Sequence, residues 1–155
     1  MAVVYERADW PFDIRPLVAA IPELDPLTEE TIAAKVTGHP LLVVARVEDR
    51  IVGFKLGYTI GQETFDSWIG GVEPAFRQHG VARELLRLQE RLVREMGLTK
   101  IIVKSMNRFP AMLRFLISEG YQLVAVETRE GRESKIVFEK PLPPALAQTT
   151  GEPSR

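Results

Sequence analysis

The stretch that decides the fold is residues 68–83, which read Trp68-Ile69-Gly70-Gly71-Val72-Glu73-Pro74-Ala75-Phe76-Arg77-Gln78-His79-Gly80-Val81-Ala82-Arg83. An apolar strand runs through a short turn into the start of a long helix. The first N–H groups of a helix lack partners within it and carry about half a positive charge, so such a junction is a candidate anion site. Gly80 lets the backbone approach an anion closely, and Arg77 adds a fixed positive charge. A plain strand-to-helix turn explains the pattern equally well.

The glycine pair Gly70-Gly71 lies inside the predicted strand. Paired glycines in a strand are typical of a β-bulge or of a close backbone approach. A bulge would leave backbone groups unpaired and let the strand diverge from its neighbour, so that an extended, amide-bearing ligand could add to the strand edge. A sterically crowded position in the core is the alternative.

Outward from this stretch, the hydrophobic periodicity predicts a mixed sheet with helices packed on it in three layers. The predicted strands are 3–7, 41–47, 51–60, 65–72, 100–106, 121–128 and 135–140, and the predicted helices are 12–20, 28–36, 81–96 and 110–119. Thr28 suits the N-cap of the second helix. Along 51–60, the even-numbered residues from Val52 to Ile60 should share one face.

The clearest helix is 81–96, because its apolar residues recur at helical spacing. The predicted apolar stripe consists of Val81, Leu85, Leu88, Leu92 and Met96. Ion pairs at i,i+4 are expected on the other side, between Arg91 and Glu95 and between Glu90 and Arg94.

The amino-acid composition excludes several classes of protein and of functional site. The 155 residues include no Cys, which excludes disulfides, thiolate metal sites and a cysteine nucleophile. The two histidines are far apart and make no metal site. The net charge is −1, so nucleic-acid binding is not expected, and no apolar run is long enough for a membrane span, so membrane binding is not expected either.

No signal peptide is evident, so a cytoplasmic location is expected. We expect one domain over 1–140 and a disordered, proline-rich tail over 141–155.

Charge is divided unevenly along the chain. Residues 1–75 carry 6 basic and 12 acidic side chains, whereas residues 76–155 carry 14 basic and 9 acidic ones. This division suggests an anionic ligand held by the second half and a cationic one received by the first. A chance distribution over solvated faces fits the counts as well.

The motif Arg77-x-x-Gly80-x-Ala82, which follows a strand and opens an amphipathic helix, resembles the acetyl-CoA motif of the GNAT superfamily. Asn107, a helix and then Gly120-Tyr121 resemble that family's later segment, although the stretch between Asn107 and Gly120 is longer than its commonest version. The resemblance covers about residues 3–140. It implies an α/β fold, a GNAT-like three-layer α/β/α sandwich with a central mixed, splayed sheet.

The resemblance also implies a cofactor site. Acetyl-CoA would be the co-substrate, with no metal, and pantetheine would pair like a strand with Gly70, Gly71 and Val72. Asn107 would contact the cofactor and Arg77 would lie beside it. The pyrophosphate would be held by the backbone N–H groups of Gln78, His79, Gly80, Val81, Ala82 and Arg83.

The implied activity is N-acetyltransfer, in which a primary amine attacks the thioester directly within a ternary complex. The N–H of Val72 would hold the oxyanion. Asp66, six residues before Val72, is the candidate base, because some family members carry a catalytic Glu there. Glu63 or water alone are alternatives for this role. The family's frequent Tyr acid is replaced by Leu116, which cannot donate a proton.

The acceptor is expected to be a small-molecule or peptide amine. The acids Glu23, Asp25, Glu29 and Glu30 could receive a cationic amine or simply be surface charges. Dimerisation of the chain is left open. A GNAT-shaped module that holds acyl-CoA without turnover is one competing function, favoured by Leu116. Another is a domain that binds a phosphorylated metabolite, which predicts no splay between the strands at Gly70 and Lys100.

Overall fold

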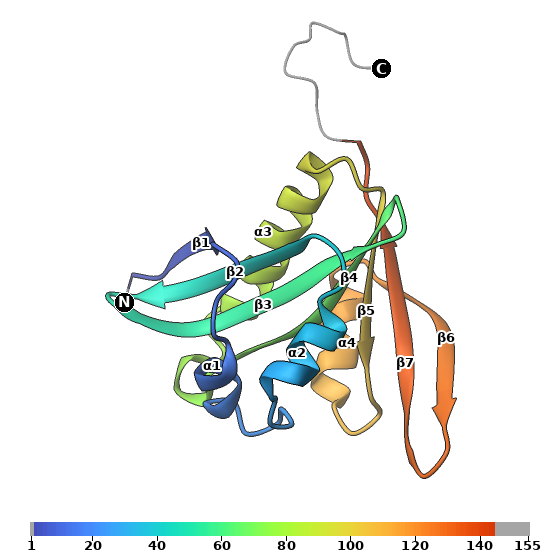
Figure 1. Cartoon of the computed structure of the whole chain (residues 1–155), viewed down its shortest axis with the longest axis horizontal. Coiled ribbons are helices and arrows are strands. Elements are labelled where there is room, and N and C mark those ends of the chain that lie inside the picture. The colour runs from blue at the N-terminus through green and yellow to red at the C-terminus, as the bar shows by residue number, and fades with distance from the viewer. Residues whose placement is uncertain (1, 145–155) are drawn as a thin grey trace, which may run out of the picture.

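The computed structural model describes residues 2–144, and the predicted order of elements is confirmed (Figure 1). The strands are β1 (Val4–Ala8), β2 (Pro40–Val47), β3 (Arg50–Ile60), β4 (Thr64–Val72), β5 (Lys100–Ser105), β6 (Gln122–Arg129) and β7 (Arg132–Pro141). The helices are α1 (Arg15–Ala19), α2 (Glu29–Lys35), α3 (Val81–Glu95) and α4 (Pro110–Ser118), with a 3-10 turn at Pro74–Phe76. Thr28 caps α2 as predicted, accepting a hydrogen bond from the N–H of Thr31.

The strands form one sheet in the order β1-β2-β3-β4-β5-β7-β6. All neighbours are antiparallel except β4 and β5. This parallel pair is joined only over Thr64–Asp66 and Lys100–Ile102, after which the two strands diverge. The predicted splay is therefore present, and its apex lies at Asp66.

The helices cover both faces of the sheet, so the predicted three-layer sandwich is confirmed (Figure 1). On one face, Ile14, Val18 and Ile21 of the α1 segment pack with Phe54 and Leu56 of β3. Ile32 and Val36 of the α2 segment join the same cluster. The other face carries α3 and α4, whose packed residues include Leu85, Leu86, Val93 and Leu116.

Helix α3 is rotated slightly from the predicted stripe. Its buried residues are Val81, Leu85, Leu86, Gln89 and Val93. Met96 is 37% exposed, so its assignment to the stripe was wrong. The Arg91–Glu95 pair forms at 3.7 Å, whereas the predicted Glu90–Arg94 pair does not. Tertiary contacts override the local spacing, because Glu90 faces Lys140 and Arg94 donates to the carbonyl of Pro143.

A register shift of the kind made by a β-bulge lies between β3 and β4 at Leu56/Tyr58, and not at the glycine pair where we predicted one. Ser67 and Trp68 there lie opposite Gly57 alone. A Cβ on Gly57 would fall 2.3 Å from the carbonyl oxygen of Asp66, so the extra residue is accommodated by glycine.

The glycine pair itself is explained by crowding. A Cβ on Gly70 would lie 2.5 Å from the carbonyl oxygen of Phe54, and one on Gly71 would lie 2.9 Å from the side chain of Ile21.

A second register shift lies between β2 and β3 at Ala45/Arg46 and turns Val52 to the α3 face. Val52 therefore does not share a face with Phe54 and Leu56, contrary to the prediction.

The packed chain extends beyond the predicted boundary at residue 140. Pro141 pairs with Lys100, and Leu142 is buried in the cluster that contains Leu116. The remainder of the predicted tail, residues 145–155, lies outside the described residues. Within residues 2–144, no helix is both long and apolar enough to cross a membrane.

Candidate functional site

The turn between β4 and α3 presents a row of free backbone donors. Gly80 is the N-cap of α3 with φ +79°, and Gln78 also has a positive φ of 67°. A Cβ on Gly80 would meet nothing within 4 Å, so glycine is favoured there by the backbone conformation rather than by space. The N–H groups of residues 78–83 find no acceptor within the described part of the chain, and Gln78, His79, Ala82 and Arg83 are exposed. Such a turn can bind an anion such as a pyrophosphate.

The open edge of β4 continues from this turn. The N–H of Glu73 donates to the carbonyl of Val52 on β3 at 2.9 Å. Antiparallel pairing alternates, so Gly71 bonds to β3 while Gly70 and Val72 direct their N–H and C=O groups to the other side. On that side β5 has diverged. The N–H of Val72 is thus aimed into the splay, as an oxyanion donor requires.

Arg77 bridges the end of β4 and the segment between α1 and α2. Its Nε donates to the carbonyl oxygen of Val72 at 2.9 Å. Its two terminal nitrogens lie 2.6 and 2.7 Å from the carboxylate oxygens of Glu23, in the segment between α1 and α2. The carboxylate raises the pKa of Arg77, and the guanidinium lowers the pKa of Glu23. Arg77 therefore adjoins the anion turn, but its charge is already matched by Glu23.

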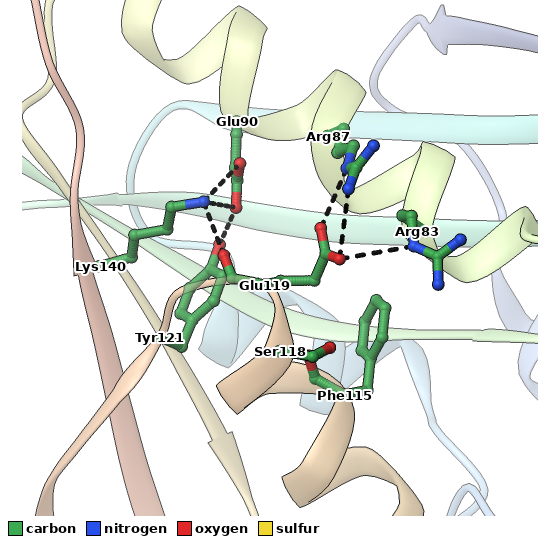
Figure 2. Close-up of polar contacts among 8 residues, drawn as sticks. All are labelled: Arg83, Arg87, Glu90, Phe115, Ser118, Glu119, Tyr121 and Lys140. Carbon is green, nitrogen blue, oxygen red and sulfur yellow. Dashed lines mark hydrogen bonds and ion pairs between the residues drawn. The ribbon is translucent and has the colours of Figure 1, made fainter.

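Two further arginines, Arg83 and Arg87, project from the first two turns of α3 toward α4 (Figure 2). The carboxylate of Glu119, whose side chain is only 7% exposed, lies 3.4 Å from Arg83 Nε and 3.0 Å from Arg87 Nε. The sequence analysis proposed Arg83 but missed Arg87 and Glu119. The i,i+4 spacing of the arginines was the available signal, because it places both on one side of the helix.

Glu90, two turns further along α3, is held by Tyr121 and Lys140 (Figure 2). The Tyr121 hydroxyl donates to Glu90 Oε2 at 2.6 Å, and Lys140 Nζ lies 3.2 Å from Glu90 Oε1. Lys140 also donates to the carbonyl of Glu119 at 2.8 Å. Burial and the nearby charge of Glu90 raise the pKa of Tyr121 far above its ordinary value, so Tyr121 is a neutral donor rather than an acid catalyst.

Lys55 lies against the glycine pair from the β3 side. It is directly opposite Gly70, and its Cγ would be 2.7 Å from a Cβ built on that residue. Burial lowers the pKa of Lys55 to about 8, against the opposing effect of Glu90 and Asp66. Within residues 2–144, its Nζ has no hydrogen-bond or ion-pair partner. The sequence analysis did not single out this residue.

Asp66 lies at the apex of the splay, paired with Ile102 on one side and with Tyr58 on the other. It is half-buried, and burial raises the pKa of its carboxyl against the opposing charges of nearby lysines. Burial, followed by the Asp66 charge, raises the pKa of Tyr58 to about 12. A carboxyl of raised pKa at the end of the open edge is well suited to accept a proton.

The other candidates occupy different places. Glu63 lies in the turn before β4, at the closed end of the splay, where its carboxylate accepts from Thr99 Oγ1 at 3.2 Å. Asn107 follows β5 at the open end and is exposed. Leu116 is 1% exposed and packs in the same core cluster as Leu86, so its side chain is enclosed by the core. Among the described residues, no three His, Asp or Glu side chains gather as a metal site would require.

The open strand edge and the free helix N-terminus define a fold of the coenzyme-dependent acyltransferase class. The sequence profile described as the Acetyltransferase (GNAT) family matches residues 5–121, and the chain belongs to this family. No curated protein sequence matches the chain.

Solved structures show the same fold at low identity. The ribosomal-protein-S18-alanine N-acetyltransferase of Escherichia coli superposes with a TM-score of 0.77 at 16% identity, covering 94% of this chain and 96% of that one. An IAA acetyltransferase from Bacillus cereus gives 0.75 at 19% identity, covering 91% and 100%. A GNAT acetyltransferase from Elizabethkingia anophelis with acetyl-CoA bound gives 0.73 at 17% identity, covering 90% and 98%.

Proposed function

We propose that the protein is an N-acetyltransferase that moves the acetyl group of acetyl-CoA to a primary amine by direct attack. The observation that carries this proposal is the run of free N–H groups over residues 78–83 beside the open edge of β4. Together they provide donors for a pyrophosphate and a strand edge for an amide-bearing pantetheine arm. The Elizabethkingia anophelis structure binds acetyl-CoA in the same fold, which supports this choice of cofactor.

In the proposed complex, the pyrophosphate lies on the N–H groups of residues 78–83, with Arg83 beside it. Pantetheine pairs with the segment of Gly70, Gly71 and Val72 through the outward backbone groups of Gly70 and Val72, and Asn107 approaches from the end of β5. Arg77 lies on the same outward side of β4, where it fixes the carbonyl of Val72. A strand edge whose carbonyl is already bonded presents its N–H in a fixed direction.

The attacking amine must be neutral, but an alkylammonium group has an ordinary pKa of about 10.4 and is protonated at neutral pH. Asp66 takes one proton from the ammonium group, and the amine nitrogen then bonds to the thioester carbon. The carbonyl oxygen becomes an oxyanion held by the N–H of Val72. Collapse of the tetrahedral intermediate breaks the carbon–sulfur bond and expels the coenzyme thiolate, which takes the second proton of the attacking nitrogen, so that the amide and the free thiol are formed. A thiol of pKa roughly 8.5 leaves acceptably without an acid, so Leu116 is compatible with turnover.

A second candidate function is a module that binds acyl-CoA without turnover. The burial of Leu116 favours it, because the proton donor common in the family is missing. The cleft acid Asp66 favours the enzyme instead. Acetyl transfer to any amine would decide between the two.

The test is calorimetric titration of acetyl-CoA into the native protein and into the Gly80→Glu variant. Gly97→Glu is the matched control, because Gly97 ends α3 with φ +87° and also has open space around it. Both variants place a carboxylate on a left-handed residue, but only Gly80→Glu puts it at the anion turn. We expect a Kd on the order of 1 μM for native protein and control, with at least about tenfold weaker binding by Gly80→Glu. Failure of the native protein to bind acetyl-CoA would overturn the proposal.

A further inference from the structure

A belt of polar side chains crosses five neighbouring strands on the sheet face that carries α2. The registers place its members on one face: Tyr58 is opposite Asp66, Asp66 pairs with Ile102, Lys104 pairs with Val137, and Lys135 pairs with Glu127. Side chains alternate along a strand, so Lys104 shares the face of Ile102, and Lys135 shares that of Val137. The polar belt consists of Tyr58, Asp66, Lys104, Lys135 and Glu127.

The belt has an acidic end at the splay and a basic end beyond it. Lys104 lies between these ends and is neutralised, since its Nζ is 3.1 Å from Glu127 Oε2. Lys135 is half-buried, and its pKa is lowered by burial and then by the charges of Lys35, Arg129 and Lys104.

Three cations around the belt, Lys35, Lys135 and Arg129, have no counter-ion within the described part of the chain. Neither Lys35, in the last turn of α2, nor Lys135 forms an ion pair within the described part of the chain. Arg129 donates to the backbone carbonyl of Glu133, which does not neutralise its charge. Four cations therefore gather around two carboxylates, Asp66 and Glu127, and the surplus charge is positive. A bound anion would relieve the mutual repulsion of these cations.

The acids that the sequence suggested for a cationic acceptor are partly occupied. Glu23 is bound to Arg77, and Glu29 lies 3.4 Å from Arg15. These two carboxylates are therefore less available to a cationic acceptor than the sequence suggested, whereas Asp66 remains without an ion pair among the described residues.

We propose that the acceptor is an amine that also carries a carboxylate, with the amine at Asp66 and the carboxylate at Lys35 and Lys135. This inference rests on the proposed acetyltransferase function and names its substrate class. The two ends of the belt would align such a molecule, since its ammonium is attracted to the apex of the splay while its carboxylate is attracted away from it. The same field would repel a diamine at its far end.

The test uses a ladder of acceptors that differ only in the far end. Each ω-amino acid from glycine to ε-aminocaproate is compared with the n-alkylamine and the diamine of the same chain length, and acetyl transfer is followed as kcat/KM. At the chain length that spans the belt, we expect the ω-amino acid to exceed both partners by about tenfold or more, the size of one charge-assisted contact.

The variants are Lys35→Gln and Lys135→Gln, with Lys100→Gln as control. Lys100 is on the same sheet face but at the closed end of the splay, where it pairs with Glu139. Lys35→Gln and Lys135→Gln, the two belt variants, should each raise KM for the ω-amino acid severalfold and leave kcat and the Kd for acetyl-CoA unchanged. The control should keep the native ranking. If the native protein binds acetyl-CoA but acetylates no member, the ladder is titrated into the coenzyme-saturated protein and binding is ranked instead.

An equal or reversed ranking of the ladder, or belt variants that keep the native preference, would overturn the inference while leaving acetyl transfer intact. A native protein that does not bind acetyl-CoA fails at the earlier step and removes the proposed function itself. The two failures are therefore distinguishable.

Discussion

The guanidinium of Arg77 and the carboxylate of Glu23 face each other through two parallel hydrogen bonds, of 2.6 and 2.7 Å. The pair joins the segment between α1 and α2 to the turn that opens α3. A third bond, from Nε to the carbonyl of Val72, makes Arg77 the support of the strand edge that the coenzyme would use.

Arg77→Gln and Glu23→Gln should therefore have unequal effects. Both side chains are more than a third exposed, so each substitution should cost at most about 1 kcal/mol of stability. Arg77→Gln should weaken acetyl-CoA binding about tenfold, because the Val72 carbonyl loses its donor. Glu23→Gln should leave binding unchanged or tighter, since Arg77 regains an unmatched charge beside the anion turn. Urea unfolding and calorimetry measure the two quantities, and equal losses of affinity would contradict this assignment.

Gln89→Leu should destabilise the fold by about 1–3 kcal/mol, although Leu has similar volume and higher hydrophobicity. Gln89 is fully buried and accepts from Ser67 Oγ at 2.7 Å beside the register shift of β4. The substitution leaves that hydroxyl without a partner. Adding Ser67→Ala should recover part of the loss. Denaturant midpoints of the single and double variants give the coupling, and strictly additive losses would show that the bond is unimportant.

Lys55→Met should stabilise the protein at neutral pH, by on the order of 2 kcal/mol. The pKa of Lys55 is lowered from 10.5 to about 8 in the folded state. Between these values the unfolded chain binds more protons, so the stability of the native protein should rise with pH from 8 to about 10.

The Met variant should lack this rise, and the difference between the two proteins should shrink toward pH 10. Unfolding at pH 7 and at pH 9.5 measures it. Above pH 10 the raised pKa of Tyr58 lowers stability in both proteins, so the comparison is confined to lower pH. A difference that does not vary between these two pH values would mean that Lys55 titrates normally.

Asp66→Asn should lower kcat/KM for acetyl transfer by about 10²–10⁴-fold, the usual contribution of a positioned base. Because burial raises its pKa, the acidic limb of the pH profile should lie above the ordinary carboxyl range. Glu63→Gln is the matched control and should be neutral, since Glu63 lies at the closed end of the splay. A full loss in Glu63→Gln with activity retained in Asp66→Asn would exchange the two roles.

The architecture was predictable because each element carries a local signal. Thr28 marks a helix start, Gly80 and Gly97 delimit α3, and the apolar runs give the strands. The splay was suggested by the glycine pair Gly70-Gly71 and, more specifically, by the resemblance of the residues around Gly80 to a known family. The predicted position of the register shift was wrong, because the pair Gly70-Gly71 is conspicuous in the sequence. The need for glycine at position 57 arises from a contact with the partner strand, which the sequence does not show.

The pairings that the sequence did not reveal depend mostly on contacts between distant parts of the chain. Glu23 and Arg77 are 54 positions apart, and no local spacing links them. Glu90 has a plausible local partner in Arg94, yet it bonds to Tyr121 and Lys140. In the sequence, Lys35 and Lys135 have the pattern of ordinary surface lysines. Their proximity arises only when the fold brings α2 and β7 to the same face of the sheet. Charge pairing of this kind is fixed by topology rather than by sequence spacing.

The burial of Leu116 constrains how this protein could change over generations. A tyrosine at that position would have to fit into the packed cluster that contains Leu86, so the single substitution would strain the core. Compensating changes in the residues around it would be needed for the larger ring to be accommodated. In the proposed enzyme, a proton donor would therefore be gained more readily at an exposed position than at residue 116, where the tyrosine frequent in the family would stand.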